Sequence, residues 1–531
     1  MHLRAHHHYP SRRSAVAADN MVATSHPLAT QAGVTMLSRG GNAVDAALAT
    51  AITLTVVEPS GNGLGSDAFA IVWDGTELHG LNASGRAPAA WTPERFAGHD
   101  RMPIHGWETV TVPGAVASWV SLSDRFGKLP FATLFEPAIK YAEDGFPVSP
   151  VIAKLWARAG EQLGDQPGFA ETFLPDGRAP RAGEYFSSPG HARTLKLIAE
   201  TKGKAFYEGE IAEEIAAYAK AHDAALTVAD MAANAPDWCG TISGSFDDAT
   251  LHEIPPNGQG IAALMGLGIL TQTGIRNMDA DDPQALHLQI EAMKLALRDA
   301  EHYVADEDHM TSVGATDLLD DGYLADRARL IDLNRATNFG AGAPKVGGTV
   351  ILSAADASGM MVSFIQSNYM GFGSGVVVPG TGVSLQNRGA GFSLDPDNQN
   401  RVGPGKRPFH TIIPGFLMGP DAPLMSFGVM GGPIQAQGHV QMTLRTQLWG
   451  QDPQMAVDAP RWRVTQGMGV ALEDTLPDAT IAALRDLGHD ITLETPDNAF
   501  GFGGGQLIQR LGARGYVAGS DPRKDGAAMG F

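Results

Sequence analysis

The alternation of apolar and polar positions near the start of the chain predicts two helices followed by a β-hairpin. Residues 27–37 have helical spacing, and Ser25 is the expected N-cap of this first helix. Asn42 is expected to cap a second helix over residues 44–57. This helix carries few charges on any face and is therefore predicted to lie buried in a large core. The apolar runs on either side of Asp74–Gly75 predict the hairpin.

The pattern changes along the rest of the chain. From about residue 113 to residue 300 it is mainly helical, most clearly over residues 285–304, where apolar residues recur at helical spacing. Residues 349–356 and 360–367 are instead apolar on both faces, which is typical of strands that are covered on both sides. Predicted strands lie near the beginning of the chain and again in its last third. Segments distant in sequence are therefore expected to share a sheet in a layered α/β fold.

Composition limits the class of protein. The chain has 531 residues, 44% of them hydrophobic, which is enough for a large core in several domains or one layered unit. Its net charge of −20 disfavours binding to nucleic acid or to an anionic membrane surface. The N-terminus has no apolar core of a secretory signal, and the apolar stretch 46–57 is too short to span a bilayer, so we expect a soluble cytoplasmic protein.

The single cysteine and the histidines offer little chemistry. Cys239 can form no disulfide within the chain and is expected to be an ordinary thiol. His287, His302, Asp306 and His309 are a candidate metal set, but no known ligand motif surrounds them and a solvated helix face explains them as well. We therefore expect neither a metal nor a cofactor. The motifs GxSxG, SxxK, HExxH and GxxxxGK[ST] are all absent from the sequence.

Thr349 is the remaining candidate, because it follows Gly347 and Gly348 at the head of a predicted buried strand. A β-branched residue suits a strand and needs no further explanation. Cleavage of the bond between Gly348 and Thr349, however, would place an α-amine with a pKa of about 8 beside the threonine hydroxyl, where it could act as a base. The residues alone leave both interpretations open.

Several ordered blocks add a resemblance that covers most of the chain. The sequence resembles the gamma-glutamyltransferase (gamma-glutamyl transpeptidase) family of N-terminal-nucleophile hydrolases. The blocks are MVATSHPLATQAGVTMLSRGGNAVDAALATAITLTVVEPSGNGLGSDAF, EIPPNGQGIAALMGLGIL, LQIEAMKLALRDAEHYVAD, TVILSAADASG, GPGKRPFHTIIPG, GVMGGPIQAQG, DAPRW and GSDPRKDG. The lack of a secretory signal indicates a divergent, non-secreted relative.

The resemblance implies a precursor that cleaves itself between Gly348 and Thr349. Residues 1–348 would form a large subunit and residues 349–531 a small subunit. The two subunits would remain bound to each other as one intertwined globular unit. The implied fold is α/β, a four-layer αββα sandwich. Whether copies of the molecule form a homo-oligomer stays open.

The resemblance also implies catalytic roles. Thr349 would attack a small-molecule amide and form an acyl-enzyme, which is released to water or to an amine. The backbone N–H groups of Gly431 and Gly432 would form the oxyanion hole. Ser367 would be a second hydroxyl that orients Thr349, although a strand serine is an equally simple interpretation.

The sequence differs from the family at positions that bind the substrate. Val350 to Leu352 replace the usual residues after the nucleophile, and Ser84 stands where the family has a carboxylate-binding arginine. The family has an acidic residue that binds the glutamyl amino group, and the segment LQNRGAGFS contains no counterpart of it. His410 and Thr411 stand where the family has paired serines.

Two arginines remain to hold a substrate carboxylate, Arg86 and Arg388, with His410 and Thr411 as further substrate-binding candidates. For each arginine the alternative is a structural role. The expected function is a self-processing amidohydrolase or acyltransferase acting on a small carboxylate-bearing amide. The alternatives are a true glutathione hydrolase or transpeptidase, an oxamate amidohydrolase or a cephalosporin or glutaryl acylase, and a non-catalytic relative that acts as a binding protein.

Overall fold

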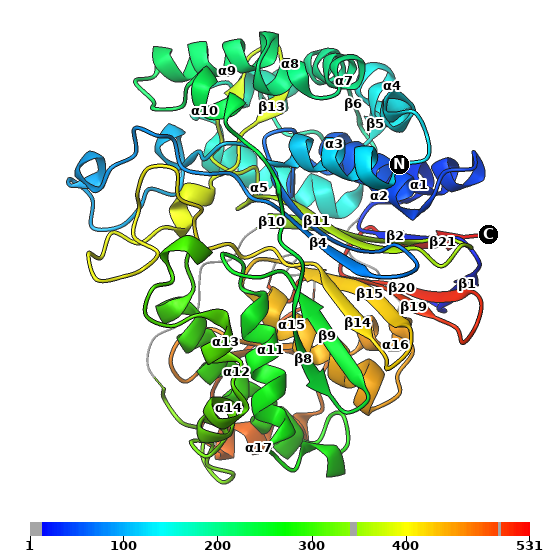
Figure 1. Ribbon diagram of the computed structural model, residues 1–531, viewed down its shortest axis with the longest axis vertical. Helices are drawn as coiled ribbons and strands as arrows, with labels where there is room; N and C mark the ends of the chain where they lie inside the picture. The colour runs from blue at the N-terminus through cyan, green and yellow to red at the C-terminus, as the bar shows by residue number, and fades with distance from the viewer. Residues whose placement is uncertain (1–12, 340–347, 497–500) are drawn as a thin grey trace.

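Two β-sheets lie face to face at the centre of the protein, and helices cover the outer face of each (Figure 1). The computed structural model describes residues 13–339, 348–496 and 501–531. Two sequence features lie outside these residues: the polar N-terminal tail that contains His6–His8, and the segment GAGAPK (residues 340–345), whose composition predicts an exposed loop. The arrangement is the expected four-layer αββα sandwich.

Each central sheet has seven strands, and neighbouring strands are antiparallel. The first sheet contains, in spatial order, β21 (Ala527–Gly530), β2 (Met21–Thr24), β10 (Gly348–Ala355), β11 (Met361–Tyr369), β3 (Asp67–Trp73), β4 (Leu78–Ala83) and β7 (Asp237–Trp238). The second contains β1 (Val16–Ala18), β20 (Tyr516–Ser520), β19 (Gly504–Arg510), β15 (Pro423–Met430), β14 (Gly415–Met418), β9 (Ala249–Glu253) and β8 (Ile242–Phe246).

Both sheets mix strands from before and after residue 348. Distant segments therefore share each sheet, as the pattern of early and late strands predicts. Smaller sheets pair β5 (Phe146–Pro147) with β6 (Tyr185–Phe186), β12 (Val377–Val378) with β13 (Val383–Ser384), and β16 (Trp462–Val464) with β17 (Gly469–Glu473) and β18 (Asp490–Glu494).

The helices divide into two layers along the chain. Those that pack on the first sheet are α1 (Pro27–Ser38), α2 (Ala43–Val57), α3 (Ala115–Phe126), α4 (Glu136–Asp144), α5 (Pro150–Leu163), α6 (Phe169–Phe173), α7 (Pro189–Thr201), α8 (Lys204–Tyr207), α9 (Glu210–Ala221) and α10 (Val228–Ala232). Those that pack on the second are α11 (Gly260–Thr271), α12 (Pro283–Tyr303), α13 (Ala315–Leu318), α14 (Asp321–Ala328), α15 (Ile434–Thr443), α16 (Pro453–Asp458) and α17 (Asp478–Asp486).

Three large apolar cores fill the spaces between the four layers. One lies between each helical layer and its sheet. The third lies between the sheets, where Phe69 and Ile351 of the first sheet share a cluster with Phe416 and Ile508 of the second. Burial on both faces explains why β10 and β11 carry apolar residues on both faces.

Most of the predicted local elements are present. Asn42 caps α2 with a capping box, and the hairpin around Asp74–Gly75 is β3–β4. The predicted cap of α1 was wrong: the N-cap is His26, whose side chain accepts from Leu28 N, whereas Ser25 donates to the Glu58 carboxylate at 2.6 Å. Among the described residues, no helix is long and apolar enough to cross a bilayer.

Candidate active site

Thr349 lies at the start of β10, fully buried, at an irregularity in the sheet. Gly348 pairs with Tyr369 on β11, but Val350 pairs with Gln366, so β11 has an extra residue opposite Thr349. Such bulges locally interrupt the ladder and redirect side chains. The hydroxyl of Thr349 lies within hydrogen-bonding distance of side chains from β11 and α15.

Two side chains contact the Thr349 hydroxyl directly. Its Oγ1 lies 3.2 Å from the Oγ of Ser367. Gln435 at the start of α15 donates from Nε2 to the same Oγ1 at 3.4 Å. The amide orientation of Gln435 is fixed because its Oε1 accepts from Ile413 N at 3.0 Å, which leaves the NH₂ group for Thr349.

Ser367 links the nucleophile candidate to a buried arginine. Its hydroxyl oxygen accepts from Arg388 Nη2 at 2.8 Å and from Tyr369 N at 2.7 Å. Arg388 also donates from Nη1 to Thr411 Oγ1 at 2.8 Å. Four residues singled out from the sequence, Thr349, Ser367, Arg388 and Thr411, therefore form one hydrogen-bonded chain.

Arg388 is an unusual cation because its side chain is buried without a carboxylate partner. It is 1% exposed, and its guanidinium carbon lies 4.5 Å from the ring centroid of Tyr369. Its Nε finds no acceptor, and the described residues provide no salt bridge to it. Burial lowers the pKa of Arg388 to about 10, so it remains charged at neutral pH.

His410 and Asp67 form a second buried pair beside this chain. His410 Nε2 and Asp67 Oδ2 are 3.1 Å apart, and Asp67 Oδ1 accepts from the backbone N–H groups of Gly85 and Gly114. Burial raises the pKa of Asp67 to about 7, against the opposing effect of the Arg388 charge. Burial and the positive charge of Arg388 hold the pKa of His410 well below its ordinary value.

Gly431 and Gly432 connect the end of β15 to the N-terminus of α15. Their φ angles are +128° and +72°, in the region that favours glycine. Backbone N–H groups at a helix N-terminus carry partial positive charge, which suits an oxyanion. Gln259 supports this turn by donating from Nε2 to the Gly432 carbonyl at 3.0 Å.

The structure places Arg86 apart from the Thr349 chain. Its half-exposed guanidinium lies 3.3 Å from Asp306 and 3.9 Å from Asp237, and it also donates to the Gly405 carbonyl. Ser84 is buried and donates to the Asn82 side chain. Arg86 thus already has a carboxylate partner in Asp306, whereas Asp237 pairs more closely with Arg407.

A cavity of about 470 Å³ opens beside the Thr349 chain, within the usual size of small-molecule sites. The lining includes Tyr369, whose ring lies against Arg388, and Gln259, which bonds to the Gly432 carbonyl, but not Thr349 or Arg388 themselves. Ala390 and Gly391 of the segment LQNRGAGFS also line it. The apolar wall includes Met102, Ile104, Leu297, Met370, Phe392, Leu394 and Phe409, and the charged groups are Asp100, Arg101, Glu301 and Asp395.

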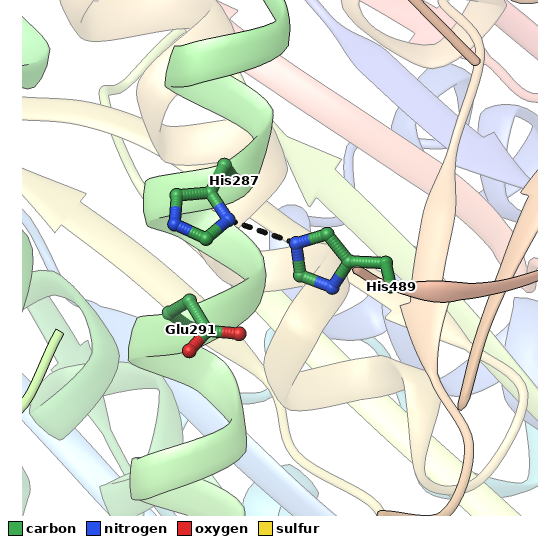
Figure 2. Close-up of side chains that lie close together, drawn as sticks. All are labelled: His287, Glu291 and His489. Atoms are coloured by element: carbon green, nitrogen blue, oxygen red, sulfur yellow. Dashed lines mark hydrogen bonds between the residues drawn. The ribbon is translucent and has the colours of Figure 1, made fainter. Parts of the chain in front are cut away.

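The candidate metal set is not brought together as a group. Among the described residues, the close groups of three metal-ligand types are His287 with Glu291 and His489 (Figure 2), and Asp74 with Glu77 and His79. Neither contains His302, Asp306 or His309. Cys239 is half-buried, and burial raises its pKa to about 11, so the thiol is weakly acidic.

Sequence reasoning missed Gln435, Tyr369 and Asp67 as members of the site. Gln435 lies two residues after Gly432–Pro433, so a predicted helix start could have drawn attention to it. Tyr369 adopts a φ of +78°, which is rare for a bulky residue and follows from the bulge beside it. No local pattern reveals Asp67, because its partner His410 is distant along the chain.

Comparisons with known proteins agree with this architecture. Residues 29–531 match the gamma-glutamyltranspeptidase family. The chain is 38% identical to the oxamate amidohydrolase proenzyme of Klebsiella pneumoniae, covering 98% of this chain and 99% of that protein. It is 33% identical to the glutathione hydrolase-like YwrD proenzyme of Bacillus subtilis, covering 98% and 100%.

Among solved structures, the cephalosporin acylase from Bacillus halodurans superposes with a TM-score of 0.95 at 47% identity, covering 100% of this chain and 99% of that one. The expected fold and the expected enzyme class, an N-terminal-nucleophile amidohydrolase or acyltransferase, are confirmed by these similarities. The chain belongs to the gamma-glutamyltranspeptidase family.

Proposed function

We propose that this protein cleaves itself before Thr349 and then hydrolyses small amides that carry a carboxylate. In the precursor, the Thr349 hydroxyl attacks the Gly348 carbonyl, and the peptide nitrogen leaves as the new α-amine, giving an ester. Water then hydrolyses the ester and releases the Gly348 carboxylate. Residues 1–348 and 349–531 become the two subunits of one folded unit.

In the mature protein, the α-amine of Thr349 takes the hydroxyl proton while Oγ1 attacks the substrate amide carbon. The N–H groups of Gly431 and Gly432 stabilise the developing oxyanion. The proton passes to the leaving amine, which departs and leaves an acyl ester on Thr349. Water, or a second amine, attacks this ester and restores the hydroxyl.

The observation that carries the substrate class is the buried charge of Arg388. The Arg388 Nε has no hydrogen-bond acceptor, and no described carboxylate forms a salt bridge with the guanidinium. Burying a positive charge in this way is energetically unfavourable unless an anion binds beside it. A substrate carboxylate would supply this anion by a charge-assisted contact. Arg86 is the weaker candidate, because it is half-exposed and already paired with Asp306.

The cavity favours a second candidate, an acylase acting on larger acylated amines. Oxamate would occupy only a small part of about 470 Å³, whereas the apolar wall suits a longer acyl or amine portion. The similarity in structure to a cephalosporin acylase supports this second candidate. Glutathione hydrolysis requires an acidic side chain that binds the glutamyl α-amino group. The acidic residues of the cavity that could bind it are Asp100, Glu301 and Asp395.

A gel and a substrate panel test the proposal. The 55.8 kDa chain should separate into two fragments, the smaller beginning Thr-Val-Ile-Leu on N-terminal sequencing. Thr349→Ala should stay in one piece. A persistent single wild-type band would refute self-cleavage and favour the binding-protein alternative. Oxamate, a glutaryl amide, a glutaryl cephalosporin, γ-glutamyl-p-nitroanilide and acetyl-p-nitroanilide should then be compared by kcat/KM; preference for the last, which has no carboxylate, would refute the proposed substrate class, whereas preference for the γ-glutamyl compound would favour the glutathione hydrolase alternative.

A further inference from the structure

Two groups of the proposed site are closed off from the cavity that a substrate would enter. Thr349 is fully buried and Arg388 is 1% exposed, and neither is among the described residues that line the cavity. A substrate can react only where its amide carbon reaches Thr349 Oγ1 and its carboxylate reaches Arg388. Part of the cavity wall must therefore move when a substrate binds.

Tyr369 is the part of the wall that lies against Arg388. It is 6% exposed and lines the cavity, and its ring centroid is 4.5 Å from the guanidinium carbon of Arg388. The face of an aromatic ring attracts a cation at this distance. The ring thus covers Arg388 on the side from which an anion in the cavity would approach.

The ring is a weaker partner for Arg388 than a carboxylate would be. Burial raises the pKa of the Tyr369 hydroxyl, against the opposing effect of the Arg388 charge, so the side chain is neutral at pH 7. A ring face accepts no ordinary hydrogen bond, and the Arg388 Nε has none. A carboxylate offers two anionic oxygens to a guanidinium and forms the stronger contact. A substrate carboxylate can therefore replace the ring.

Hydrogen bonds hold the backbone around Tyr369 but leave its side chain free to turn. Tyr369 N donates to Ser367 Oγ at 2.7 Å, and Met370 N donates to Asn387 Oδ1 at 3.1 Å. Phe372 is fully buried in the core beneath the first helical layer and anchors the next turn. Among the described residues, no hydrogen bond holds the Tyr369 hydroxyl. Rotation of its side-chain torsions can thus move the ring while the backbone stays in place.

The backbone conformation of Tyr369 is a further sign that its side chain is needed. Its φ of +78° is unfavourable for a bulky residue, whereas glycine adopts such angles without strain. Strained residues of this kind cluster at active sites and ligand clamps. A tyrosine at this position indicates that the ring has a role that glycine could not supply.

We propose that Tyr369 controls the access of substrate to Arg388 and Thr349, an inference that rests on the proposed function. In the closed form the ring lies on Arg388. In the open form the ring has turned aside, the substrate carboxylate binds Arg388 in its place, and the amide reaches Thr349.

This gating role has a distinctive consequence for affinity. Because only the open form binds substrate, the population of the closed form weakens the apparent affinity. Removal of the ring should therefore strengthen binding, whereas loss of a substrate contact or of a structural contact would weaken it. Tyr369 touches no reacting atom in this scheme, so it is a positioning residue and kcat should change little.

Glutarate, the acid that hydrolysis of a glutaryl amide would release, is the probe for this test. Calorimetry gives its Kd without turnover, and glutaryl-p-nitroanilide gives kcat and KM. Tyr369→Ala removes the ring but keeps a side chain at the same φ, whereas Tyr369→Phe keeps the ring. Tyr323→Ala is the matched control, because this ring also lies against an arginine, with Arg327 at 5.1 Å, but does not line the cavity.

We expect the Kd of glutarate and the KM to fall about fivefold in Tyr369→Ala, with kcat within about threefold of wild type. Both constants should stay within about twofold of wild type in Tyr369→Phe and Tyr323→Ala. Saturating glutarate should also give an ultraviolet difference spectrum of tyrosine in the wild type, because the ring leaves Arg388. This signal should be absent from Tyr369→Phe.

Unchanged or weaker glutarate binding in folded Tyr369→Ala would overturn the gating role, as would a difference spectrum that persists in Tyr369→Phe. If Tyr369→Ala lacks the wild-type thermal transition, the spectra of wild type and Tyr369→Phe decide the question. A wild type that binds glutarate and shows the signal, but neither cleaves itself nor hydrolyses an amide, would overturn the proposed function alone. A wild type that does not bind glutarate would overturn both the gating role and the substrate class.

Discussion

Arg388 and Thr349 are linked through a single oxygen atom, the hydroxyl of Ser367. Arg388 donates to this oxygen at 2.8 Å, and Thr349 Oγ1 lies 3.2 Å from it. Tyr369 N donates to the same oxygen, so two N–H donors orient the Ser367 hydroxyl. A buried cation can thereby polarise the hydroxyl beside the proposed nucleophile without touching the nucleophile itself.

Ser367→Ala should lower kcat by about tenfold, with KM changed by less than about threefold, because a charge-assisted contact next to the reacting oxygen is lost. Self-cleavage should slow by a similar factor. Steady-state kinetics of the processed protein and a cleavage time course measure the two effects. Ser363→Ala is the matched control, since this buried serine on β11 donates to the Phe427 carbonyl. Equal effects of both variants would mean that Ser367 only packs the strand.

Gln435→Met should also reduce kcat, because the methionine fills the same space but cannot donate to Thr349 Oγ1. We expect a loss of about threefold to tenfold, in line with one neutral hydrogen bond. Gln437→Met on the same helix is the control; it breaks contacts to Pro433 and Val464 and should lower thermal stability but not kcat. Unchanged kinetics in Gln435→Met would remove Gln435 from the proposed site.

Much of the fold could be predicted from local patterns. Apolar runs of strand length gave β10 and β11, and the Asn42 cap gave the start of α2. The hairpin of β8 and β9 escaped notice, because its short strands alternate between buried and partly exposed residues within a mainly helical region. Its contribution to the second sheet depends on pairing with β14, a contact distant in sequence.

The candidate site was predictable where a residue's role is local and escaped prediction where the role depends on distant pairing. Thr349 and the glycine pair became candidates through the sequence blocks that resemble the family, and their catalytic roles stay predictions. Arg86 and Arg388 were indistinguishable as carboxylate binders, and only the fold shows that one is paired with Asp306 while the other is buried beside Ser367. The pairing of Asp67 with His410 likewise required the folded sheet.

Gly432→Ala should impair catalysis far more than stability. Its φ of +72° is unfavourable for a side chain, so the backbone is expected to rotate and turn its N–H away from the oxyanion. Removal of one such donor lowers kcat on the order of a hundredfold. Gly405→Ala is the control, because its φ is +67° and an added Cβ meets nothing within 4 Å. Both variants should lose about 1–2 kcal/mol of unfolding free energy, but only Gly432→Ala should lose activity.

Asp67 should make the free energy of unfolding depend on pH in a direction opposite to that of most carboxylates. Burial raises its pKa from 3.8 to about 7, so between these values the folded state retains a proton that the unfolded state has released. Unfolding then becomes easier as pH rises from about 4 to about 7, and the contribution levels off above 7. A shift of this size corresponds to at most about 4 kcal/mol.

Asp67→Asn tests this in a Thr349→Ala background, which keeps one uncleaved chain. Asparagine can still accept from Gly85 and Gly114, and its amide can donate to His410 Nε2 when the ring hydrogen is on Nδ1, at the cost of the 3.4 Å contact from Ile412 N. Chemical denaturation at pH 4.5, 5.5, 6.5 and 7.5 gives the difference in unfolding free energy between the two proteins. The depressed pKa of His410 makes the fold more stable as pH rises toward 6.5, but it acts in both proteins and largely cancels.

We expect the aspartate protein to lose stability relative to the asparagine variant as pH rises. If it gains instead, Asp67 is ionised in the folded protein, favoured by the charge of Arg388 and by its backbone donors. Asp67 would then already balance the buried cation, and the argument that Arg388 awaits a substrate carboxylate would fail. The same measurement therefore tests both the electrostatics of the site and the substrate class proposed for it.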